Sequence, residues 1–346
     1  MDVTGVLGRD TVHRPKFHRF TWLAGAAAFA LAACGGEETS TPTVASAGPT
    51  PSPSPSPSPT PSPTPTSSGT GQKITLDIEY AQGRTANGDI PLLLDLYEPD
   101  ETCSANRPTV LFVHGGGFRS GNKDSGNARF RAERMNARGF NFVSINYRLE
   151  PDVPIPSEPF AEVVADIIAD GFGDPDEPRL DAIAAAFEDT VTALNFLRDN
   201  QDSFCADMSR VAYWGSSAGA FTVLQVAYGL NQFGIDRPEP AVVIDYWGAL
   251  FRPSDLEVAE APFLVIHGTQ DSTVDCQNAV ELTNRAQIVG VSHAFYTVIG
   301  AGHGGQAVGL DVNEVDGQTL HELTFDFVEA HLKGEAPVYQ TVEITP

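Results

Sequence analysis

The chain has 346 residues and carries 45 acidic side chains against 21 basic ones, for a formal net charge of −24 at pH 7. So large an excess of negative charge repels nucleic acid and anionic surfaces, and we expect neither as a partner. Residues 72–346 are enough for one domain of ordinary size, and no internal repeat is evident. The acidic surface favours solubility and indicates nothing about a reaction.

The first 33 residues have the pattern of an export signal. Four basic side chains precede a short apolar stretch: Arg9, Arg14, Lys16 and Arg19. That stretch is too short to span a bilayer and ends in Leu31-Ala32-Ala33-Cys34, which resembles a bacterial lipobox. The resemblance implies that Cys34 is lipidated and becomes the mature N-terminus, whereas a plain signal peptide that contains a cysteine is the alternative. We expect an exported chain, lipid-anchored to the bacterial cell envelope and facing outside the cytoplasm.

Residues 34–71 have the composition of a linker. From residue 41 to residue 70 the chain is mostly Pro, Ser and Thr, so it cannot bury enough surface to fold. The prolines favour an extended conformation, which at about 3.1 Å per residue would hold a domain roughly 80–90 Å from its anchor. We interpret the segment as a spacer rather than a recognition motif.

From residue 72 onward, short apolar runs alternate with helical patterns. Two runs of alternating character, 74–80 and 92–97, predict an antiparallel entry to a sheet. Runs rich in Val, Ile and aromatic residues predict six buried parallel strands at 109–113, 142–147, 211–214, 241–246, 263–266 and 294–299. Helices are predicted at 127–138, 181–198, 218–228, 276–288 and 318–332. This alternation predicts an α/β fold, with a mostly parallel sheet and helices on both faces.

Three consecutive glycines follow the first buried strand. Gly115, Gly116 and Gly117 lie between His114 and Phe118, and glycine lets a backbone approach a ligand closely with its N–H groups free. Together with the amide of Ala218, these donors predict an oxyanion hole. A simple turn is the alternative for the three glycines, and we interpret His114 as structural.

The segment from Gly215 to Gly219 follows a predicted strand and precedes a predicted helix. A strand-to-helix turn this tight needs small flanking residues, which the two glycines supply, and it points the hydroxyl of the central serine into the cleft. Ser216 is the neighbouring alternative, but the glycine spacing selects Ser217 as the nucleophile.

Asp271 and His303 follow the predicted strands at 263–266 and 294–299, each on a loop. A loop histidine flanked by glycines after a terminal strand is a candidate base, and Asp271 is the candidate acid that orients it. Asp275 is the alternative acid. The order is therefore oxyanion loop, nucleophile, acid and base, which differs from the order in chymotrypsin-like and subtilisin-like enzymes.

These segments resemble the α/β-hydrolase-fold carboxylesterases that share a His-Gly-Gly-Gly loop. That group includes hormone-sensitive-lipase-like, type-B and bacterial feruloyl-esterase-like enzymes. The resemblance spans nearly the whole domain and is carried by residues 113–121, 143–149, 188–198, 211–220, 267–274 and 300–305. It implies the α/β-hydrolase fold, with Ser217 as nucleophile, His303 as base and Asp271 as orienting acid.

The resemblance further implies an oxyanion hole formed by Gly116, Gly117 and Ala218, and no metal or organic cofactor. The implied activity is hydrolysis of a small-molecule or polymer-linked carboxylic ester through an acyl-enzyme intermediate. A peptidase or polyester depolymerase on the same triad is one alternative. The other is a surface binding protein that kept the fold and lost the chemistry.

Three cysteines lie in the predicted domain, and an exported domain permits disulfides. Cys103 lies eleven residues before His114, and Cys205 lies twelve before Ser217. The family fold places the strands that end at these two motifs side by side and parallel, which brings both cysteines to the non-catalytic edge. We therefore predict a Cys103–Cys205 disulfide that leaves Cys276 free.

One departure from the family pattern is an insertion of about thirty residues, 151–179, which includes seven acidic side chains between Glu158 and Glu177. We expect this insertion to overhang the cleft and select substrate, with a peripheral helix as the alternative. By contrast, residues 247–261 are too few for a separate lid domain.

Overall fold

The computed structural model of this chain describes residues 66–68, 72–172, 174 and 176–346. The predicted signal peptide, the predicted lipidation site Cys34 and most of the predicted linker lie outside these residues. Within the described part of the chain, no helix has both the length and the apolar character that a membrane span requires.

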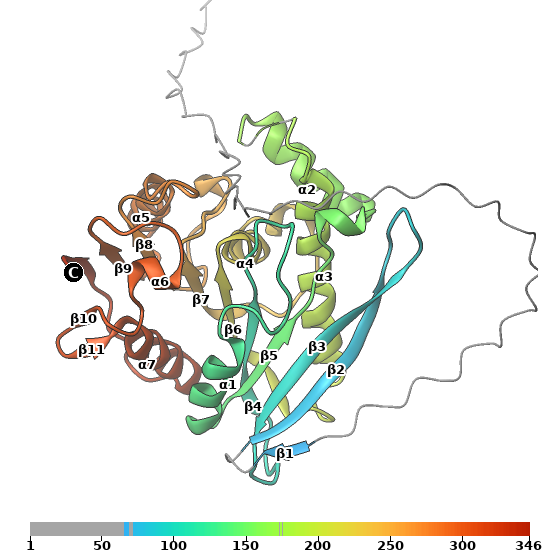
Figure 1. The fold of residues 1–346 in the computed structure, drawn as a ribbon, viewed down its shortest axis with the longest axis horizontal. Helices are drawn as coiled ribbons and strands as arrows, with labels where there is room; N and C mark the ends of the chain where they lie inside the picture. The colour runs from blue at the N-terminus through green and yellow to red at the C-terminus, as the bar shows by residue number, and fades with distance from the viewer. Residues whose placement is uncertain (1–65, 69–71, 173, 175) are drawn as a thin grey trace, which may run out of the picture.

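In the described part of the chain, ten strands form one sheet in the order β1-β2-β3-β5-β4-β6-β7-β8-β9-β12 (Figure 1). Their bounds are β1 Thr66–Ser68, β2 Gln72–Gly83, β3 Ile90–Pro99, β4 Arg107–Val113, β5 Asn141–Ile145, β6 Ala206–Ser216, β7 Pro240–Tyr246, β8 Phe263–Gly268, β9 His293–Val298 and β12 Thr341–Ile344. Strands β1, β2 and β3 enter the sheet antiparallel, and from β5 to β12 every neighbouring pair is parallel. The predicted mostly parallel sheet with an antiparallel entry is confirmed; β12 was not predicted.

Among the residues that the structure describes, seven α-helices connect the strands: α1 Ala128–Ala137, α2 Glu158–Ala169, α3 Leu180–Asp199, α4 Ala218–Tyr228, α5 Gln277–Val289, α6 Gly305–Val308 and α7 Leu320–Lys333. Short 3₁₀ helices lie at η1 Glu150–Asp152, η2 Asn231–Phe233 and η3 Pro253–Asp255, and a separate two-stranded sheet pairs β10 Glu314–Val315 with β11 Gln318–Thr319. The predicted bounds of α4 are those observed. The predicted last helix, 318–332, starts two residues too early, because residues 318–319 form β11 and Thr319 caps α7 by accepting from the Glu322 amide.

Helices cover both faces of the sheet, because successive side chains of each strand point to opposite sides. In β4, Leu111 and Val113 belong to the apolar cluster that includes α3 and α4, whereas Val110 and Phe112 belong to the cluster that includes α1 and α7. The central strands are buried on both faces, as a parallel sheet of this kind requires.

The insertion at 151–179 contains helix α2, which packs against α3 (Figure 1). The apolar side of α2 is buried: Phe160, Val163, Val164 and Ile167. Its acidic side is held by the buried Arg252, whose Nη1 donates to Asp166 at 2.8 Å and to Asp170 at 2.6 Å. The acidic side chains that mark this insertion in the sequence thus serve in part to attach it to the loop after β7.

Cys103 and Cys205 form a disulfide with a Cα–Cα distance of 6.0 Å, and Cys276 is a free cysteine. Both bonded cysteines lie just before the neighbouring parallel strands β4 and β6, where Arg107 pairs with Ala206. The predicted pairing is confirmed, and it joins the strands at the ends opposite to those that carry the glycine loop and Ser217.

Candidate active site

Three loops at the carboxyl ends of parallel strands bring Ser217, Asp271 and His303 together, as the sequence predicts. The Ser217 hydroxyl lies 2.9 Å from Nε2 of His303, and Nδ1 of the same ring lies 2.6 Å from an Asp271 carboxylate oxygen. With Nδ1–H donating to Asp271, the free lone pair of Nε2 faces the serine hydroxyl. This is the arrangement in which a serine can be deprotonated for attack.

Ser217 lies at a sharp turn between β6 and α4, with backbone angles φ 52° and ψ −122° that few non-glycine residues adopt. The turn is possible only with glycines on either side. A Cβ added to Gly219 would lie 2.0 Å from the Val113 carbonyl oxygen, and one added to Gly215 would lie 2.2 Å from the Gly219 carbonyl oxygen. Ser216, the neighbouring alternative, is the last residue of β6, and it is Ser217 whose hydroxyl lies beside His303.

The Asp271 carboxylate is fixed on both oxygens. One oxygen accepts from the amides of Thr273 and Val274 at 2.8 and 2.9 Å, and the other accepts from His303. Burial alone would raise the pKa of Asp271, but hydrogen bonds from His267, His303 and the Val274 amide hold it well below its ordinary value. The carboxylate is therefore ionised and keeps the His303 ring in one tautomer.

Asp275, the alternative acid, is not part of this constellation. Its carboxylate accepts from the Gln277 amide at 2.9 Å, at the start of α5. A histidine that the sequence did not single out, His267, lies next to Asp271 instead. The His267 ring is buried, with Nε2 2.9 Å from the Val274 carbonyl oxygen and 3.4 Å from the Asp271 carboxylate.

His267 therefore contacts the acid, Asp271, whereas the ring beside the nucleophile is that of His303. Burial alone lowers the pKa of His267, but its contact with Asp271 and the charge of the buried Asp245 raise it overall. A buried ring that donates toward Asp271 helps to keep that carboxylate ionised. Its position on β8, four residues before Asp271, was the available signal in the sequence.

Hydrogen bonds within the loop hold the carbonyl groups of Gly115 and Gly116. The Gly115 carbonyl lies 2.6 Å from Nδ1 of His114, and the Gly116 carbonyl accepts from the amides of Arg119 and Ser120, both at 3.1 Å. Gly116 and Gly117 have φ values of +124° and +62°, a region that favours glycine. A Cβ added to Gly116 would also lie 1.9 Å from the Ser120 carbonyl oxygen, so we expect an alanine there to displace the loop.

No described residue accepts a hydrogen bond from the backbone N–H of Gly116, Gly117 or Ala218. Ala218 is the first residue of α4, where an N–H has no partner within the helix. Free amides from the glycine loop and from the start of α4 could together stabilise the negatively charged oxygen of a tetrahedral intermediate formed on Ser217. The assignment of these three amides to an oxyanion hole stays a prediction.

His114 has the structural role expected of it. Its ring stacks on Tyr147 with 4.4 Å between ring centroids, and the Tyr147 hydroxyl donates to the His114 carbonyl at 3.0 Å. Burial lowers the pKa of His114 to about 4, so the ring is neutral at physiological pH. His114 thus shapes the loop, and among the described residues its Nε2 has no hydrogen-bond partner.

One contact to the glycine loop was not foreseen from the sequence. Arg179, the last residue of the insertion, donates from Nη1 to the Gly117 carbonyl oxygen at 3.0 Å. The Arg179 side chain is held by Glu177 through two further hydrogen bonds of 2.5 and 2.7 Å. Burial raises the pKa of Glu177, but the Arg179 guanidinium more than compensates and lowers it.

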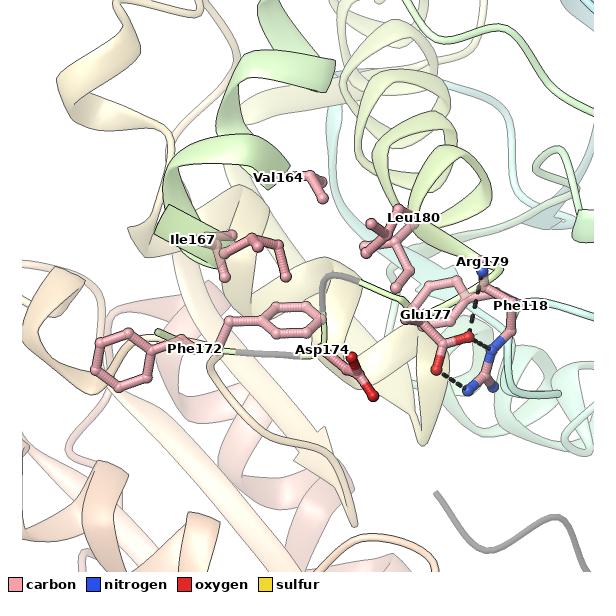
Figure 2. A pocket seen from close by; sticks show the side chains of 11 residues that line it. Phe118, Val164, Ile167, Phe172, Asp174, Glu177, Arg179 and Leu180 are labelled. Carbon is pink, nitrogen blue, oxygen red and sulfur yellow. Dashed lines mark hydrogen bonds and ion pairs between the residues drawn. The ribbon is translucent and has the colours of Figure 1, made fainter. Parts of the chain in front are cut away.

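An apolar pocket lies beside this contact, between the insertion, α3 and the glycine loop. Figure 2 shows Val164, Ile167 and Leu180 on one side, Phe172 across from them, and the Glu177–Arg179 pair next to Phe118. The full lining is Phe118, Val164, Ile167, Ile168, Phe172, Asp174, Glu177, Arg179, Leu180, Ile183 and Phe251. The triad does not line the pocket, which adjoins the site through Phe118 and Arg179.

Across residues 72–172 and 176–346, no three His, Cys, Asp or Glu side chains are grouped to hold a metal ion.

Comparison with known families matches two parts of the chain. The family model BD-FAE matches residues 94–167, which include β4, the glycine loop and part of the insertion. The model of the prolyl oligopeptidase family matches residues 236–335, which include the loops of Asp271 and His303. Each match covers less than half of the chain.

Among curated proteins, the chain is similar to esterase LipI of Mycobacterium tuberculosis, with 29% identity over 182 residues. The match covers 50% of this chain and 46% of LipI. The chain spans less than half the length of the curated relatives that it matches.

Solved structures resemble the whole domain. Esterase 2 of Thermogutta terrifontis phosphorylated by paraoxon matches with a TM-score of 0.56 and 18% identity, over 78% of this chain and 96% of that chain. MGS-M1, an alpha/beta hydrolase from a deep-sea metagenome, matches with a TM-score of 0.51 and 19% identity, over 76% of this chain and 99% of that chain. The chain therefore has the α/β-hydrolase fold.

Proposed function

We propose that this protein is a serine carboxylic-ester hydrolase that acts outside the cytoplasm through a Ser-His-Asp triad. The observation that carries the proposal is the hydrogen-bonded chain from Ser217 through His303 to Asp271, at 2.9 and 2.6 Å. The similarity to LipI, which is an esterase, and the fold shared with esterase 2 support the same activity.

In the proposed reaction, the Ser217 hydroxyl attacks the ester carbonyl carbon while Nε2 of His303 takes its proton. The carbonyl oxygen becomes an oxyanion, which the amides of Gly116, Gly117 and Ala218 stabilise. His303 then protonates the leaving alkoxide, and an acyl group stays on Ser217. Water, deprotonated by His303, attacks this acyl-enzyme and releases the acid.

The location outside the cytoplasm is supported by the N-terminal sequence and by the disulfide. Residues 1–33 have the composition of an export signal, and Cys34 lies where a lipoprotein would be acylated. Disulfides such as Cys103–Cys205 persist in oxidising compartments and are rare in the cytosol. We propose a lipid anchor at Cys34 as the attachment to the cell envelope.

The activity is tested by steady-state hydrolysis of p-nitrophenyl acetate, butyrate and palmitate, methyl ferulate, a polyester film and a prolyl peptide amide. Ser217→Ala is expected to lower kcat on every cleaved ester by about 10⁶-fold, because it removes the nucleophile. The matched control Ser216→Ala alters the neighbouring hydroxyl and is expected to leave kcat within a few fold.

The outcomes separate the candidate functions. Turnover of esters that disappears in Ser217→Ala supports the esterase. Cleavage of the peptide amide in preference to the esters would favour a peptidase, the second candidate suggested by the match of residues 236–335 to the prolyl oligopeptidase family. If nothing is cleaved and a fluorophosphonate fails to label Ser217, the protein is better described as a binding protein with this fold.

A further inference from the structure

We propose that Asp245 and His267 form a buried acid–base pair next to the triad, in which the His267 ring carries a positive charge that serves the carboxylates of both Asp245 and Asp271. Asp245 and His267 are then positioning residues, because they act on the reaction through Asp271 and do not touch the ester. The inference rests on the proposed esterase activity and gives a role to two buried groups that the triad mechanism does not use.

The register of the sheet places the two side chains together. Asp245 pairs with Val265 in the neighbouring parallel strands β7 and β8 (Figure 1), and His267 lies two residues beyond Val265. Side chains two residues apart on a strand point to the same face, so His267 is a diagonal neighbour of Asp245. On its other side, Asp245 pairs with Gly215 of β6, two residues before the nucleophile Ser217. The pair therefore lies in the part of the sheet that carries the triad.

Each member of the pair is fully buried and has one polar atom without a hydrogen-bond partner among the described residues. The Gly248 amide donates to Oδ1 of Asp245 at 2.7 Å, and Oδ2 is the unpartnered atom. Nε2 of His267 lies 2.9 Å from the Val274 carbonyl oxygen and 3.4 Å from the Asp271 carboxylate, and Nδ1 is the unpartnered atom. Because Nε2 faces two oxygen atoms, it carries a proton, and the charge of the ring is decided at Nδ1.

A proton on Nδ1 makes the two unpartnered atoms complementary, since an N–H can donate and Oδ2 can accept. It also supplies a positive charge for two buried carboxylates, which are costly to bury without one. Burial raises the pKa of Asp245 to about 6, although the charge of His267 lowers it, so the carboxylate is mostly ionised at pH 7. Burial lowers the pKa of His267, but the contact with Asp271 and the charge of Asp245 raise it overall. Geometry and charge thus favour the same protonated ring.

The groups around the pair leave this assignment of charge in place. The other titratable side chains there are Tyr228 of α4, Cys276 at the start of α5, Asp271 and Asp275 on the loop after β8, and His303 after β9. Burial and nearby carboxylates raise the pKa of Cys276 to about 11 and that of Tyr228 well above 10, so both are neutral at pH 7. Asp275 is exposed, and Thr297, which pairs with His267 from β9, does not titrate.

The charge of His267 is read directly by NMR of the full-length protein with ¹⁵N in its eight histidines. At pH 7, both ring nitrogens of His267 are expected to be protonated, whereas the buried His114, with its pKa lowered to about 4, is expected to be neutral. Spectra of His267→Gln and His114→Asn assign the two rings. Asp245→Asn is expected to weaken proton binding to His267 about tenfold, and the control Asp275→Asn to leave it unchanged. A neutral His267 at pH 7, or equal titration in Asp245→Asn and wild type, would overturn the pair.

The effect on catalysis is measured by a double-mutant cycle of kcat on p-nitrophenyl acetate. His267→Gln keeps a donor without the charge and is expected to lower kcat about tenfold, because a charged donor holds Asp271 more strongly. Asp245→Asn in the wild type is expected to lower kcat about threefold, since His267 then loses its charge. In the His267→Gln background, the same substitution removes a buried carboxylate that has lost its cation, and it is expected to leave kcat unchanged or raise it.

This dependence on background separates positioning from damage to the fold, because two substitutions that only loosen the structure lower kcat additively. Additive losses would therefore overturn the positioning role. The NMR measurement needs no turnover, so it also separates this inference from the proposed activity. A wild type that hydrolyses esters with a neutral His267 loses only the pair. A wild type with a charged His267 that hydrolyses no ester counts against the esterase itself.

Discussion

Arg179 and Gly117 are joined by a hydrogen bond of 3.0 Å from the guanidinium to the carbonyl oxygen, and this bond ties the insertion to the glycine loop. The Glu177 carboxylate holds the guanidinium in place from the other side. Through this bond, the insertion holds the peptide group between Gly117 and Phe118, which directly follows the proposed oxyanion donors Gly116 and Gly117. Arg179 is therefore a positioning residue, which acts on the reaction through the loop.

We predict that Arg179→Met lowers kcat on a short ester about tenfold with little change in KM. A hydrogen bond from a charged donor contributes about 1.5–3 kcal/mol, and part of it is lost from the transition state when the loop relaxes. Arg179→Lys keeps a cation and is expected to recover part of the loss. The control is Arg252→Met, which releases α2 from the loop after β7 without touching the glycine loop. Equal losses of kcat in the Arg179 and Arg252 variants would show that Arg179 acts only by stabilising the insertion.

For the acid, we predict that Asp271→Asn lowers kcat about 10⁴-fold, because the amide favours the wrong tautomer of His303. Asp275→Asn is the matched control and is expected to leave kcat within twofold. The pKa of Asp271 lies well below its ordinary value, so the carboxylate stays ionised at every pH above about 4 and takes up a proton only well below that pH. Loss of activity between pH 7 and 5 should therefore be independent of Asp271 titration. Steady-state rates of both variants across this range test the assignment, which fails if Asp275→Asn is the more damaging substitution.

For stability, we predict that His114 makes the fold sensitive to acid. Burial lowers its pKa to about 4, below the unfolded value of about 6.5, so the unfolded chain binds the proton first as pH falls. The contribution to stability is complete above about pH 6.5 and is lost progressively toward pH 4, by about 3 kcal/mol in total. His114→Asn retains a donor to the Gly115 carbonyl and cannot titrate. Urea unfolding at several pH values should show the wild type losing about 3 kcal/mol more than the variant, and parallel curves would refute this role.

For the disulfide, we predict that the double variant Cys103→Ala/Cys205→Ala loses about 3–4 kcal/mol of unfolding free energy. The bond closes a loop with a sequence separation of 102 residues, and its main effect is on the unfolded chain. The value of kcat on a short ester should stay unchanged, because the bond lies at the ends of β4 and β6 away from the triad. Denaturation with and without dithiothreitol measures the effect, with Cys276→Ala as control. A double variant as stable as the wild type would mean that the bond does not constrain the unfolded chain.

The strands and the triad could be predicted from the sequence because their signals are local. Strand β6, the Gly-x-Ser-x-Gly turn and helix α4 follow one another within the segment 206–228, and each needs particular residue types. The pairing of Cys103 with Cys205 also followed, once the resemblance supplied the order of the strands.

What the sequence did not show depends on contacts between distant segments. Arg179 meets a backbone carbonyl 62 residues away, and a carbonyl carries no side-chain signal. Strand β12 is short and lies at an edge of the sheet, where only its pairing with β9 defines it. The sequence left open whether the insertion overhangs the cleft or forms a peripheral helix, because the attachment of α2 depends on Arg252, a residue more than eighty positions away that pairs with Asp166 and Asp170.

The position of the disulfide has a consequence for the integrity of the molecule. Cys103 and Cys205 enclose the glycine loop, the whole insertion and helix α3 in one covalent ring. A protease that cuts once within that ring, for example in the insertion, leaves both fragments bonded to each other. On a denaturing gel such a nicked molecule runs as one covalent species, and it separates into two pieces only when a reductant opens the disulfide.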